Sequence, residues 1–135
     1  MLQVLKVNPL IPTLWEDLLA KTQEDLKGGG LIVFQTDTFY GLGADPFNKT
    51  AVDKIYEING RNSNKPLLLL IDSPAKLGDL VEEPSEDSVK LIETFWPGPL
   101  TILFKPKQTI PENITNGLIG IRQPGNSITR KLLSS

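Results

Sequence analysis

The spacing of apolar residues along the chain predicts helices that alternate with strands. The segment Thr13–Glu16 has the form of a capping box, and apolar residues three to four positions apart follow it, so it is expected to open an amphipathic helix. The three glycines at 28–30 are expected to end this helix, because glycine readily adopts the left-handed conformation found after helix C-termini. The uninterrupted apolar run 31–34 is then typical of a buried strand.

The same alternation continues to the end of the chain. Thr50 is expected to cap a second helix, with Val52, Ile55 and Tyr56 on its apolar side, which stops near Gly60. Later predicted elements are a strand at 67–71, a helix starting at Ser73 and Pro74, a helix from Ser85 to Phe95, strands at 100–104 and 118–121 joined by a connection rich in Pro, Asn and Gly at 106–117, and a helix at 128–133 capped by Ser127. Helices that alternate with strands favour a layered α/β sheet.

Length and composition fit a single soluble domain. The chain has 135 residues, of which 39% are hydrophobic and 22% charged, and a chain of this size buries about two thirds of its unfolded surface. No apolar run approaches the ~20 residues needed to span a membrane, and the first residues lack the basic region and cleavage site of a secretory signal. We therefore expect one cytoplasmic domain, residues 1–135, with no membrane contact.

Two residue types are missing from the sequence, and their absence limits the chemistry. The chain has no cysteine and no histidine, which excludes disulfides, thiolate nucleophiles, cysteine-based zinc sites and the Ser-His-Asp triad. An enzyme of this composition would work by positioning and electrostatics, or would use Asp, Glu, Lys or Tyr as acid or base. Hard cations bound through oxygen, such as Mg²⁺, stay compatible with the sequence.

The net charge of −2 hides an uneven distribution. Much of the acid lies in the run 79–93, for which a solvated helical face is the plain interpretation. Residues 100–135 carry five basic side chains against the single acidic Glu112. The basic C-terminal part weakly favours an anionic ligand.

The predicted strand 31–34 ends in polar and flexible residues. Thr36, Asp37 and Thr38 offer two hydroxyls and a carboxylate, and Gly41 and Gly43 would let the backbone approach a ligand closely. Ligands of open α/β sheets collect where strands end and loops begin. A tight polar exit from the strand would explain the same residues, and the glycines match neither the dinucleotide fingerprint nor a Walker-type loop.

Three further segments are candidates for the same site. The loop 59–66 contains Arg61, which can form a forked pair with phosphate, and Lys65, which can add a point charge. The segment 95–101 is a rigid helix-to-strand turn, and Arg122 stands at the end of an apolar strand. Taken singly, these segments also fit ordinary surface, a packed corner and a structural partner for a carboxylate.

Taken together and in this order, the four segments resemble the YrdC family of threonylcarbamoyl-AMP synthases. The family pattern Pro-Thr-Asp/Glu-Thr-x-Tyr-Gly-Leu-Gly corresponds to Gln35–Gly43, with Gln35 in place of the proline. Its Lys-x-Arg-Pro and Lys-Pro-Leu motifs correspond to Asn59–Leu67, Trp-Pro-Gly-Pro-Leu-Thr to Trp96–Thr101 and the Val-Arg-x-Pro strand end to Ile121–Pro124. The resemblance implies a YrdC-like mixed α/β (α+β) fold, with a twisted mixed β-sheet flanked by helices. It also implies that residues 1–135 form the N-terminal and central part of that fold, without the family's Ser-x-Asn loop and closing strand.

The resemblance further implies that L-threonine, bicarbonate and ATP are converted to threonylcarbamoyl-AMP and pyrophosphate, with Mg²⁺ accompanying ATP. By motif match, Thr38 would contact the substrate threonine, Thr36 would shape the same loop and Arg122 would hold the threonine carboxylate by a forked pair. The product would pass to a threonylcarbamoyl transferase complex that makes the t6A modification of tRNA.

The resemblance also implies a nucleotide site in the Arg/Lys loop. Arg61 and Lys65 would bind and position the ATP phosphates, and Asn59 stands where the family pattern has a lysine. No protein nucleophile is needed, because phosphoryl-type transfer depends on charge neutralisation and alignment. A site without histidine or cysteine can therefore carry this chemistry.

Three other functions are compatible with the sequence. A carbamoyl-adenylate-forming domain, as in the hydrogenase-maturation carbamoyltransferases, would use a similar fold. A non-catalytic RNA-binding module would bind RNA with an affinity that falls steeply with salt, and a degenerate fragment would have no activity. A sheet edge left open by a missing strand would also favour a homodimer.

Overall fold

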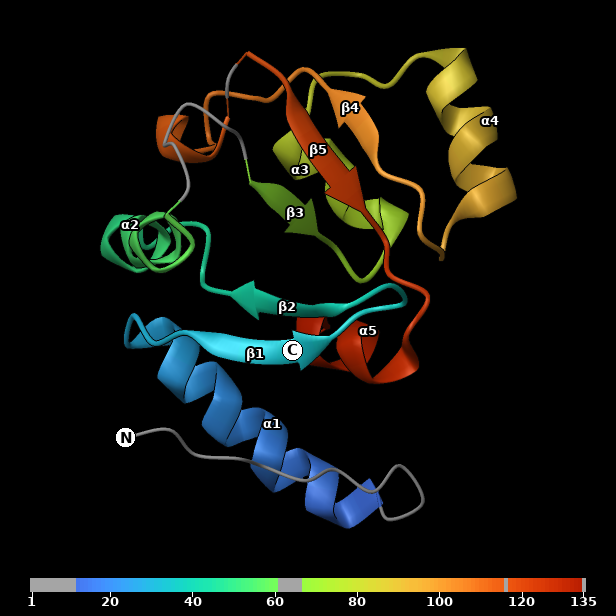
Figure 1. Ribbon diagram of the computed structural model, residues 1–135. Coiled ribbons are helices and arrows are strands. Elements are labelled where there is room, and N and C mark those ends of the chain that lie inside the picture. Colours follow the sequence, from blue (N-terminus) through green and yellow to red (C-terminus); the bar gives the residue numbers. More distant parts are fainter. Residues whose placement is uncertain (1–11, 61–66, 116, 135) are drawn as a thin grey trace.

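The computed structural model describes residues 12–60, 67–115 and 117–134. Helices and strands alternate along this part of the chain (Figure 1), so the predicted mixed α/β class is confirmed. In chain order the elements are α1 (Pro12–Lys27), β1 (Ile32–Gln35), β2 (Tyr40–Gly43), α2 (Lys49–Ile58), β3 (Leu68–Leu70), the short 3-10 helix η1 (Pro74–Lys76), α3 (Leu77–Leu80), α4 (Glu86–Phe95), β4 (Ile102–Phe104), the 3-10 helix η2 (Glu112–Ile114), β5 (Ile119–Arg122) and α5 (Ser127–Leu133).

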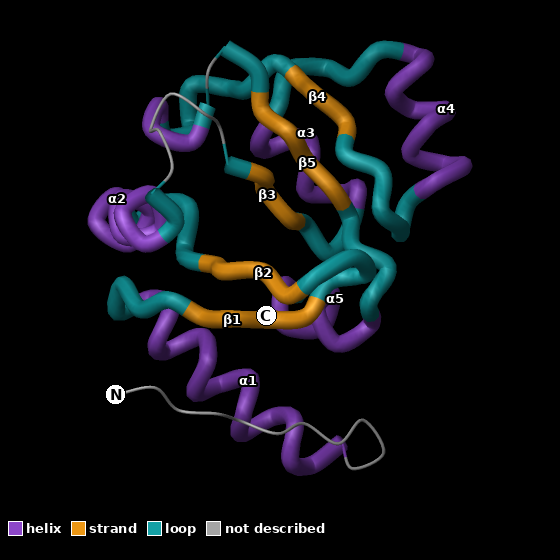
Figure 2. Tube along the Cα trace, viewed as in Figure 1, coloured by secondary structure: helices purple, strands orange, loops and turns teal. Residues whose placement is uncertain are grey.

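The described strands form two sheets, which lie one above the other in Figure 2. β1 and β2 form an antiparallel hairpin that closes at the pair Gln35 and Tyr40. In the second sheet β5 is the central strand, parallel to β3 and antiparallel to β4. This second sheet is therefore mixed, as the resemblance implied. Helices α1 and α5 lie on the hairpin side of the molecule, and α4 lies beside β4 (Figure 1).

The main hydrophobic core is built on the three-stranded sheet. All four residues of β5 are buried, and Ile119 and Ile121 are completely inaccessible to solvent. Helices α2, α3 and α4 contribute apolar side chains to the same core, namely Val52, Tyr56, Leu77 and Ile92. The buried Tyr56 hydroxyl donates a hydrogen bond of 2.9 Å to the carbonyl of Asn113, which ties α2 to η2. The most constrained strand of the molecule is thus the one that ends in Arg122.

Several predicted helix ends are confirmed by their hydrogen bonds. After α1, Gly29 has a φ of 84°, and the amides of Gly29 and Gly30 donate to the carbonyls of Leu26 and Asp25, which is a Schellman motif. Gly60 has a φ of 57° just after α2. The hydroxyl of Ser85 accepts a hydrogen bond from the amide of Ser88 and caps α4.

Three predicted N-caps are wrong by one or two residues. Helix α1 begins at Pro12, so Thr13 lies inside its first turn. The caps of α2 and α5 are Asn48, which accepts from the Ala51 amide, and Asn126, which accepts from the amides of Ile128 and Thr129. Thr50 and Ser127 are already helical. Asparagine caps as well as a hydroxyl residue, and the rule that the cap directly precedes the first apolar residue selected the wrong side chain.

Strand β2 was not expected, because the segment 39–43 was interpreted as a flexible loop. Glycine is depleted in strands and conceals the alternation of Tyr40 with Leu42. The structure gives a different reason for the glycines. A Cβ added at Gly43 would lie 2.6 Å from the ring of Phe34, and one added at Gly41 would lie 3.4 Å from it. The two glycines therefore make room for the side chain of Phe34 across the hairpin.

Two further differences concern short helices. The helix expected from Ser73 is divided into η1 and α3, and η2 lies inside the connection 106–117 that was expected to be irregular. Within the described ranges, no helix is both long enough and apolar enough to cross a bilayer.

Candidate functional site

Three of the four candidate segments meet at one place, which we call the loop junction: the turn 36–39 after β1, the turn 96–99 after α4 and the turn 123–126 after β5. The carboxylate Oδ1 of Asp37 accepts a hydrogen bond of 2.9 Å from the amide of Gly125. The amide of Gly98 donates one of 2.9 Å to the carbonyl of Gln123. These two bonds join segments that are far apart in sequence, and the junction lies at the carboxyl ends of β1 and β5, where α/β proteins bind ligands.

The junction is packed too closely to admit larger residues. A Cβ added at Gly98 would lie 2.5 Å from the carbonyl oxygen of Phe95, and one added at Gly125 would lie 3.3 Å from a carboxylate oxygen of Asp37 and 3.5 Å from the Cα of Gly98. The indole nitrogen of Trp96 donates a hydrogen bond of 2.7 Å to the carbonyl of Leu100 across the same turn. The segment is therefore a closely packed turn between α4 and β4, as the sequence predicted.

Thr36 has a structural role in this arrangement. Its hydroxyl oxygen accepts hydrogen bonds from the amides of Thr38 and Phe39, and its amide donates to the carbonyl of Phe39. The Thr38 hydroxyl is exposed and lies 3.1 Å from the Thr36 hydroxyl. Thr36 thus closes the four-residue turn of the hairpin and orients Thr38 at its outer edge.

The role of Asp37 differs from the one expected from sequence, in which its carboxylate would bind a ligand. The structure uses its Oδ1 atom to hold the Gly125 amide across the junction. The neighbouring Thr129 on α5 donates from its hydroxyl to the carbonyl of Gln35 and makes a second link between the hairpin and the segment after β5. Sequence reasoning missed both links, because they join residues 88 and 94 positions apart.

Arg122 is the last residue of β5 and is 7% exposed. Its carbonyl accepts from the amide of Ile71, which fixes the strand end against the chain leaving β3. Its buried Nε atom has no hydrogen-bond partner among the described residues. A buried guanidinium N–H without a partner is costly, and a carboxylate or phosphate oxygen is the kind of group that would satisfy it.

Arg122 lines a cavity of about 510 Å³ between the two sheets, which we call the inter-sheet cavity. Thr36 and Asn59 line it as well, so three of the predicted site residues share this space. Thr38 lies outside the lining. The other walls of the inter-sheet cavity are mainly apolar side chains and backbone from β1, β2, α2, β3 and α5, among them Ile32, Phe34, Val52, Ile55, Leu132 and Leu133. An apolar cavity with a few convergent polar groups is the usual form of a small-molecule site.

The predicted nucleotide side is only partly placed. Asn59 is the C-cap of α2, and its backbone amide donates to the carbonyls of Ile55 and Glu57. Arg61 and Lys65 lie outside the described residues. Within the described ranges, no group of three or more acidic side chains could hold a metal ion. Mg²⁺ therefore stays a prediction, in which it would enter with ATP as part of the substrate.

A comparison with protein families decides the relationship of the chain. The Sua5/YciO/YrdC family model, described as "Telomere recombination", matches residues 24–135. The chain belongs to the Sua5/YciO/YrdC family. The matched range contains all four candidate segments. The family resemblance that was inferred from these segments and their order is therefore confirmed.

Two curated relatives are similar in sequence to this chain. The threonylcarbamoyl-AMP synthase of Pyrococcus abyssi is 38% identical over 110 residues, covering 80% of this chain and 32% of the relative. That of Bacillus subtilis is 37% identical over 119 residues, covering 85% of this chain and 34% of the relative. The chain thus spans about a third of the length of these curated Sua5/YciO/YrdC relatives.

Two solved structures share the family fold. Pyrococcus abyssi Sua5 complexed with L-threonine superposes with a TM-score of 0.83 at 35% identity, over 88% of this chain and 36% of that one. Escherichia coli YciO superposes with a TM-score of 0.79 at 25% identity, over 88% of this chain and 59% of that one. The YrdC-like fold is therefore confirmed for this Sua5/YciO/YrdC member.

Proposed function

We propose that this chain binds L-threonine in the inter-sheet cavity and contributes to the synthesis of threonylcarbamoyl-AMP. The observation that carries the proposal is the buried Arg122, whose Nε has no partner among the described residues and which lines a mainly apolar cavity beside the loop junction. A carboxylate is the natural partner for such a guanidinium. The threonine bound to Pyrococcus abyssi Sua5 and the names of the curated relatives support the same choice.

In this proposal Arg122 holds the threonine carboxylate, and Thr36 lies in the wall of the cavity beside the same substrate. Thr38, at the outer edge of the hairpin turn that Thr36 closes, would contact the substrate from outside the lining. The threonine amino group combines with bicarbonate, with loss of water, to form a carbamate. A carbamate oxygen then attacks the α-phosphate of ATP, the bond to the β-phosphate breaks, and pyrophosphate leaves. Threonylcarbamoyl-AMP would be passed to a threonylcarbamoyl transferase complex for the t6A modification of tRNA.

The nucleotide would be bound from the α2 side of the cavity. Asn59 lines that side, and Arg61 and Lys65 follow it in the chain. Positive charge there would neutralise the triphosphate and align it with the carbamate, which is what phosphoryl-type transfer requires of a protein.

Calorimetric titration with L-threonine tests the proposal. Arg122→Ala is expected to weaken threonine binding by about ten- to hundredfold, because a forked hydrogen-bonded pair to a charged group is lost. Threoninamide, which lacks the carboxylate, should bind the parent chain and the variant equally weakly. Unchanged threonine affinity in the variant would contradict the proposed role of Arg122.

Two further measurements separate binding, folding and turnover. Arg122→Met fills a similar volume without a buried donor, so it should raise the free energy of unfolding by about 1 kcal/mol while threonine binding is lost. Pyrophosphate release should require threonine, bicarbonate and ATP together. Threonine binding without pyrophosphate release would show that this chain is a threonine-binding domain, and it would contradict the catalytic half of the proposal.

A further inference from the structure

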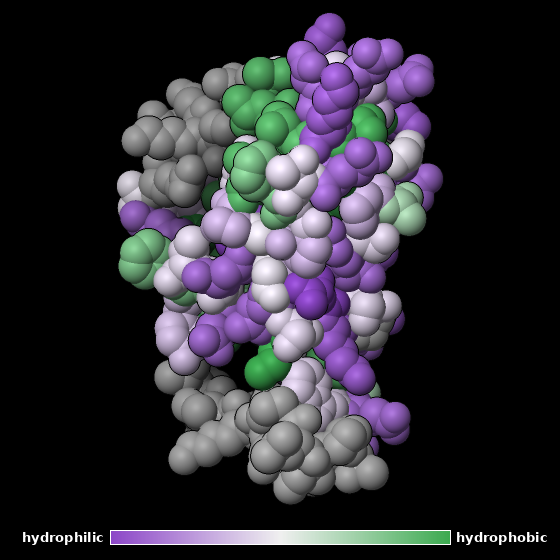
Figure 3. Space-filling view, turned by 90° about the vertical axis from the view of Figure 1, so that its right-hand side faces the viewer, coloured by the Kyte–Doolittle hydropathy of each residue, from purple (hydrophilic) through white to green (hydrophobic). Residues whose placement is uncertain are grey.

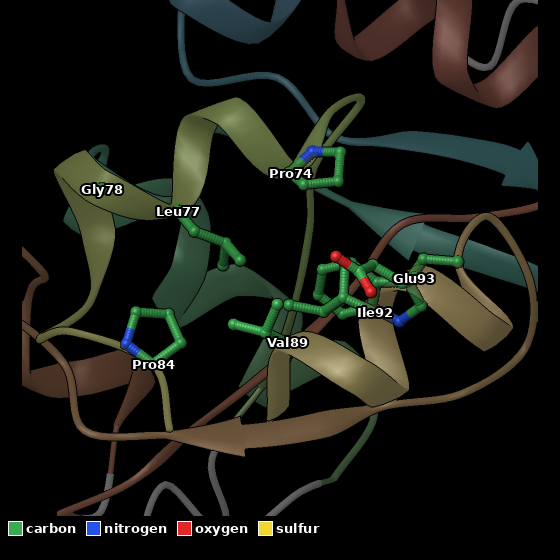
Figure 4. Close-up of a pocket in the computed structure, with 8 residues that line it drawn as sticks. Pro74, Leu77, Gly78, Pro84, Val89, Ile92 and Glu93 are labelled. Carbon is green, nitrogen blue, oxygen red and sulfur yellow. The ribbon is translucent and has the colours of Figure 1, made fainter. Parts of the chain in front are cut away.

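A second cavity of about 510 Å³ lies between α3 and α4 and shares Trp96 with the loop junction, and we call it the α4 groove. Its floor is formed by the buried side chains of Leu77, Ile92 and Trp96. Figure 4 shows Leu77 and Val89 facing each other across the groove, with the carboxylate of Glu93 at its rim. The two prolines Pro74 and Pro84 complete the walls. The interior of the groove is therefore apolar.

The groove is open to solvent. Val89 is 41% exposed, and no atom lies within 4 Å of a Cβ added at Gly78, which is part of the wall. Figure 3, which shows the side of the molecule on which α4 lies, has hydrophobic residues set among hydrophilic ones. Leu91 and Phe95, which are 40% and 51% exposed, lie on the other side of the same helix and are not part of the groove. An open apolar recess is typical of an interaction site.

Glu93 is the acidic residue in the wall of the groove, and the segment of the chain that forms the groove is rich in acidic residues. Residues 72–96 contain seven acidic residues against two lysines: Asp72, Asp79, Glu82, Glu83, Glu86, Asp87 and Glu93 against Lys76 and Lys90. Lys76 is already paired with Asp72, and the nearby Lys107 donates to the carbonyl of Gly78. None of the ion pairs among the described residues includes Glu86 or Glu93. The rim of the groove thus carries negative charge without a partner in the described part of the chain.

The position of Glu93 is not explained by the stability of its own helix. Glu86 and Asp87 lie in the first turn of α4, where negative charge is favourable, whereas Glu93 lies in the last turn, where it opposes the helix dipole. Glu86 and Glu93 are seven residues apart, so they fall on one side of the helix, next to the row Val89, Ile92 and Trp96. This pattern is one apolar row bordered by two carboxylates.

We propose that the α4 groove docks a basic peptide segment of another protein, in which an apolar anchor residue is flanked by Lys or Arg. The anchor would fill the recess above Leu77 and Ile92, and the flanking cations would pair with Glu86 and Glu93. Nucleic acids and anionic membrane surfaces are disfavoured partners, because their phosphates would face these carboxylates.

A second copy of the chain is also a poor occupant. The basic helix α5 would be its natural donor, but Arg130 already donates to the carbonyls of Pro124 and Gly125, and Lys131 lies 5.7 Å from the ring centre of Trp15. The cations of α5 are therefore engaged within their own chain.

Fluorescence anisotropy with a labelled synthetic peptide, Gly-Lys-Arg-Ala-Leu-Leu-Ala-Lys-Arg-Gly, tests the proposal on the full chain. The expected dissociation constant is on the order of 10–100 µM, as for small transient interfaces. Binding should weaken with added salt. It should be lost when serine replaces both leucines of the peptide, or when glutamate replaces its basic residues.

Three variants locate the site. Gly78→Trp fills the groove and Glu93→Lys reverses the charge of its rim, and each should weaken peptide binding about tenfold or more. Glu57→Lys makes the same charge change on α2 and should leave binding within about twofold. Circular dichroism checks that each variant is folded, and Gly78→Ala with Glu93→Gln are the milder pair if either is not.

Every outcome decides the proposal. Weakened binding in the groove variants alone supports it. No measurable binding of the peptide, equal binding of the serine or glutamate peptides, or binding unaffected by the groove variants overturns it. Concentration-dependent self-association that Gly78→Trp abolishes, measured by sedimentation, would also overturn it and would assign the groove to a second copy.

Discussion

The two cavities of this molecule have the same volume but different walls. The inter-sheet cavity contains a buried guanidinium, carried by a central strand and placed beside turns that are hydrogen-bonded to one another. The α4 groove has an apolar floor and charged groups only at its exposed rim. At the loop junction a Cβ added at Gly98 meets backbone at 2.5 Å, whereas a Cβ added at Gly78, in the wall of the α4 groove, meets nothing within 4 Å.

This difference indicates two kinds of ligand. A polar group buried on a rigid strand keeps one orientation and can therefore select a small ligand by hydrogen-bond geometry. An open apolar recess with solvated charges at its rim offers little geometric selection but suits an adaptable peptide with an anchor residue. Two cavities of equal volume therefore suit different ligands, because their polar atoms lie in different places.

The largest expected effect contrasts the two glycines. Gly98→Ala should lower the free energy of unfolding by about 2–3 kcal/mol, because its Cβ would clash with the Phe95 carbonyl and force the turn apart. Gly78→Ala in α3 should not destabilise the protein, since its Cβ has open space and alanine favours helix. Urea unfolding of both variants is the measurement. Equal stability of the two would show that the junction is no tighter than the groove.

Asp37→Ala should have the next largest effect. It removes the acceptor of the Gly125 amide, and the loss of a hydrogen bond to a charged group at this exposed position is expected to cost about 1–2 kcal/mol of stability. Threonine affinity should also fall, because the turn after Arg122 loses its link to the hairpin. Asp37→Asn keeps an acceptor oxygen and should restore most of both properties. If it restores neither, the carboxylate acts other than through Gly125.

Asn59→Lys tests the α2 side of the inter-sheet cavity. An added positive charge there should tighten ATP binding by about 1 kcal/mol, roughly fivefold, if the triphosphate lies as proposed. Stability should change little, because lysine is favourable at a helix C-terminus. The matched control is Ile58→Lys, which adds the same charge to an exposed neighbouring position. Calorimetry with ATP should detect tighter binding for Asn59→Lys alone, and an equal gain for both variants would indicate only a general field effect.

The smallest effect is expected on the surface of α2, away from both cavities. The hydrogen bond from Lys49 is the main cause that lowers the pKa of the Asp53 carboxyl, with the charge of Lys49 adding to it. A lowered folded-state pKa stabilises the fold above the pKa of the unfolded chain, and this contribution is lost as the pH falls through the folded value. The pair is exposed, so its contribution is small.

Asp53→Asn measures that contribution. At neutral pH its urea midpoint should lie slightly below that of the parent, and the difference should disappear in acid below the folded pKa. A difference that grows as the pH falls would reverse the sign of the argument.

The candidate site was predicted from sequence as far as local signals reach. Arg122 was located because an apolar run ends directly before it, and the turn at Trp96 because its prolines and glycine permit few conformations. Strand β2 was missed because its glycines are required by Phe34, a cross-strand contact with no local signature. The role of Asp37 was missed for the same reason, since its partner Gly125 is 88 positions away.

The sequence by itself determined the alternation of helices and strands, most helix ends and the order of the candidate segments, because these depend on residues within one or two turns of each other. Only the tertiary structure decided that Asp37, Gly98 and Gln123 form one junction, that Arg122 lies buried with its Nε unpartnered, and that the acidic run borders an apolar groove. These features arise from the packing of segments that are distant in sequence. Local spacing carries no information about which of those segments meet.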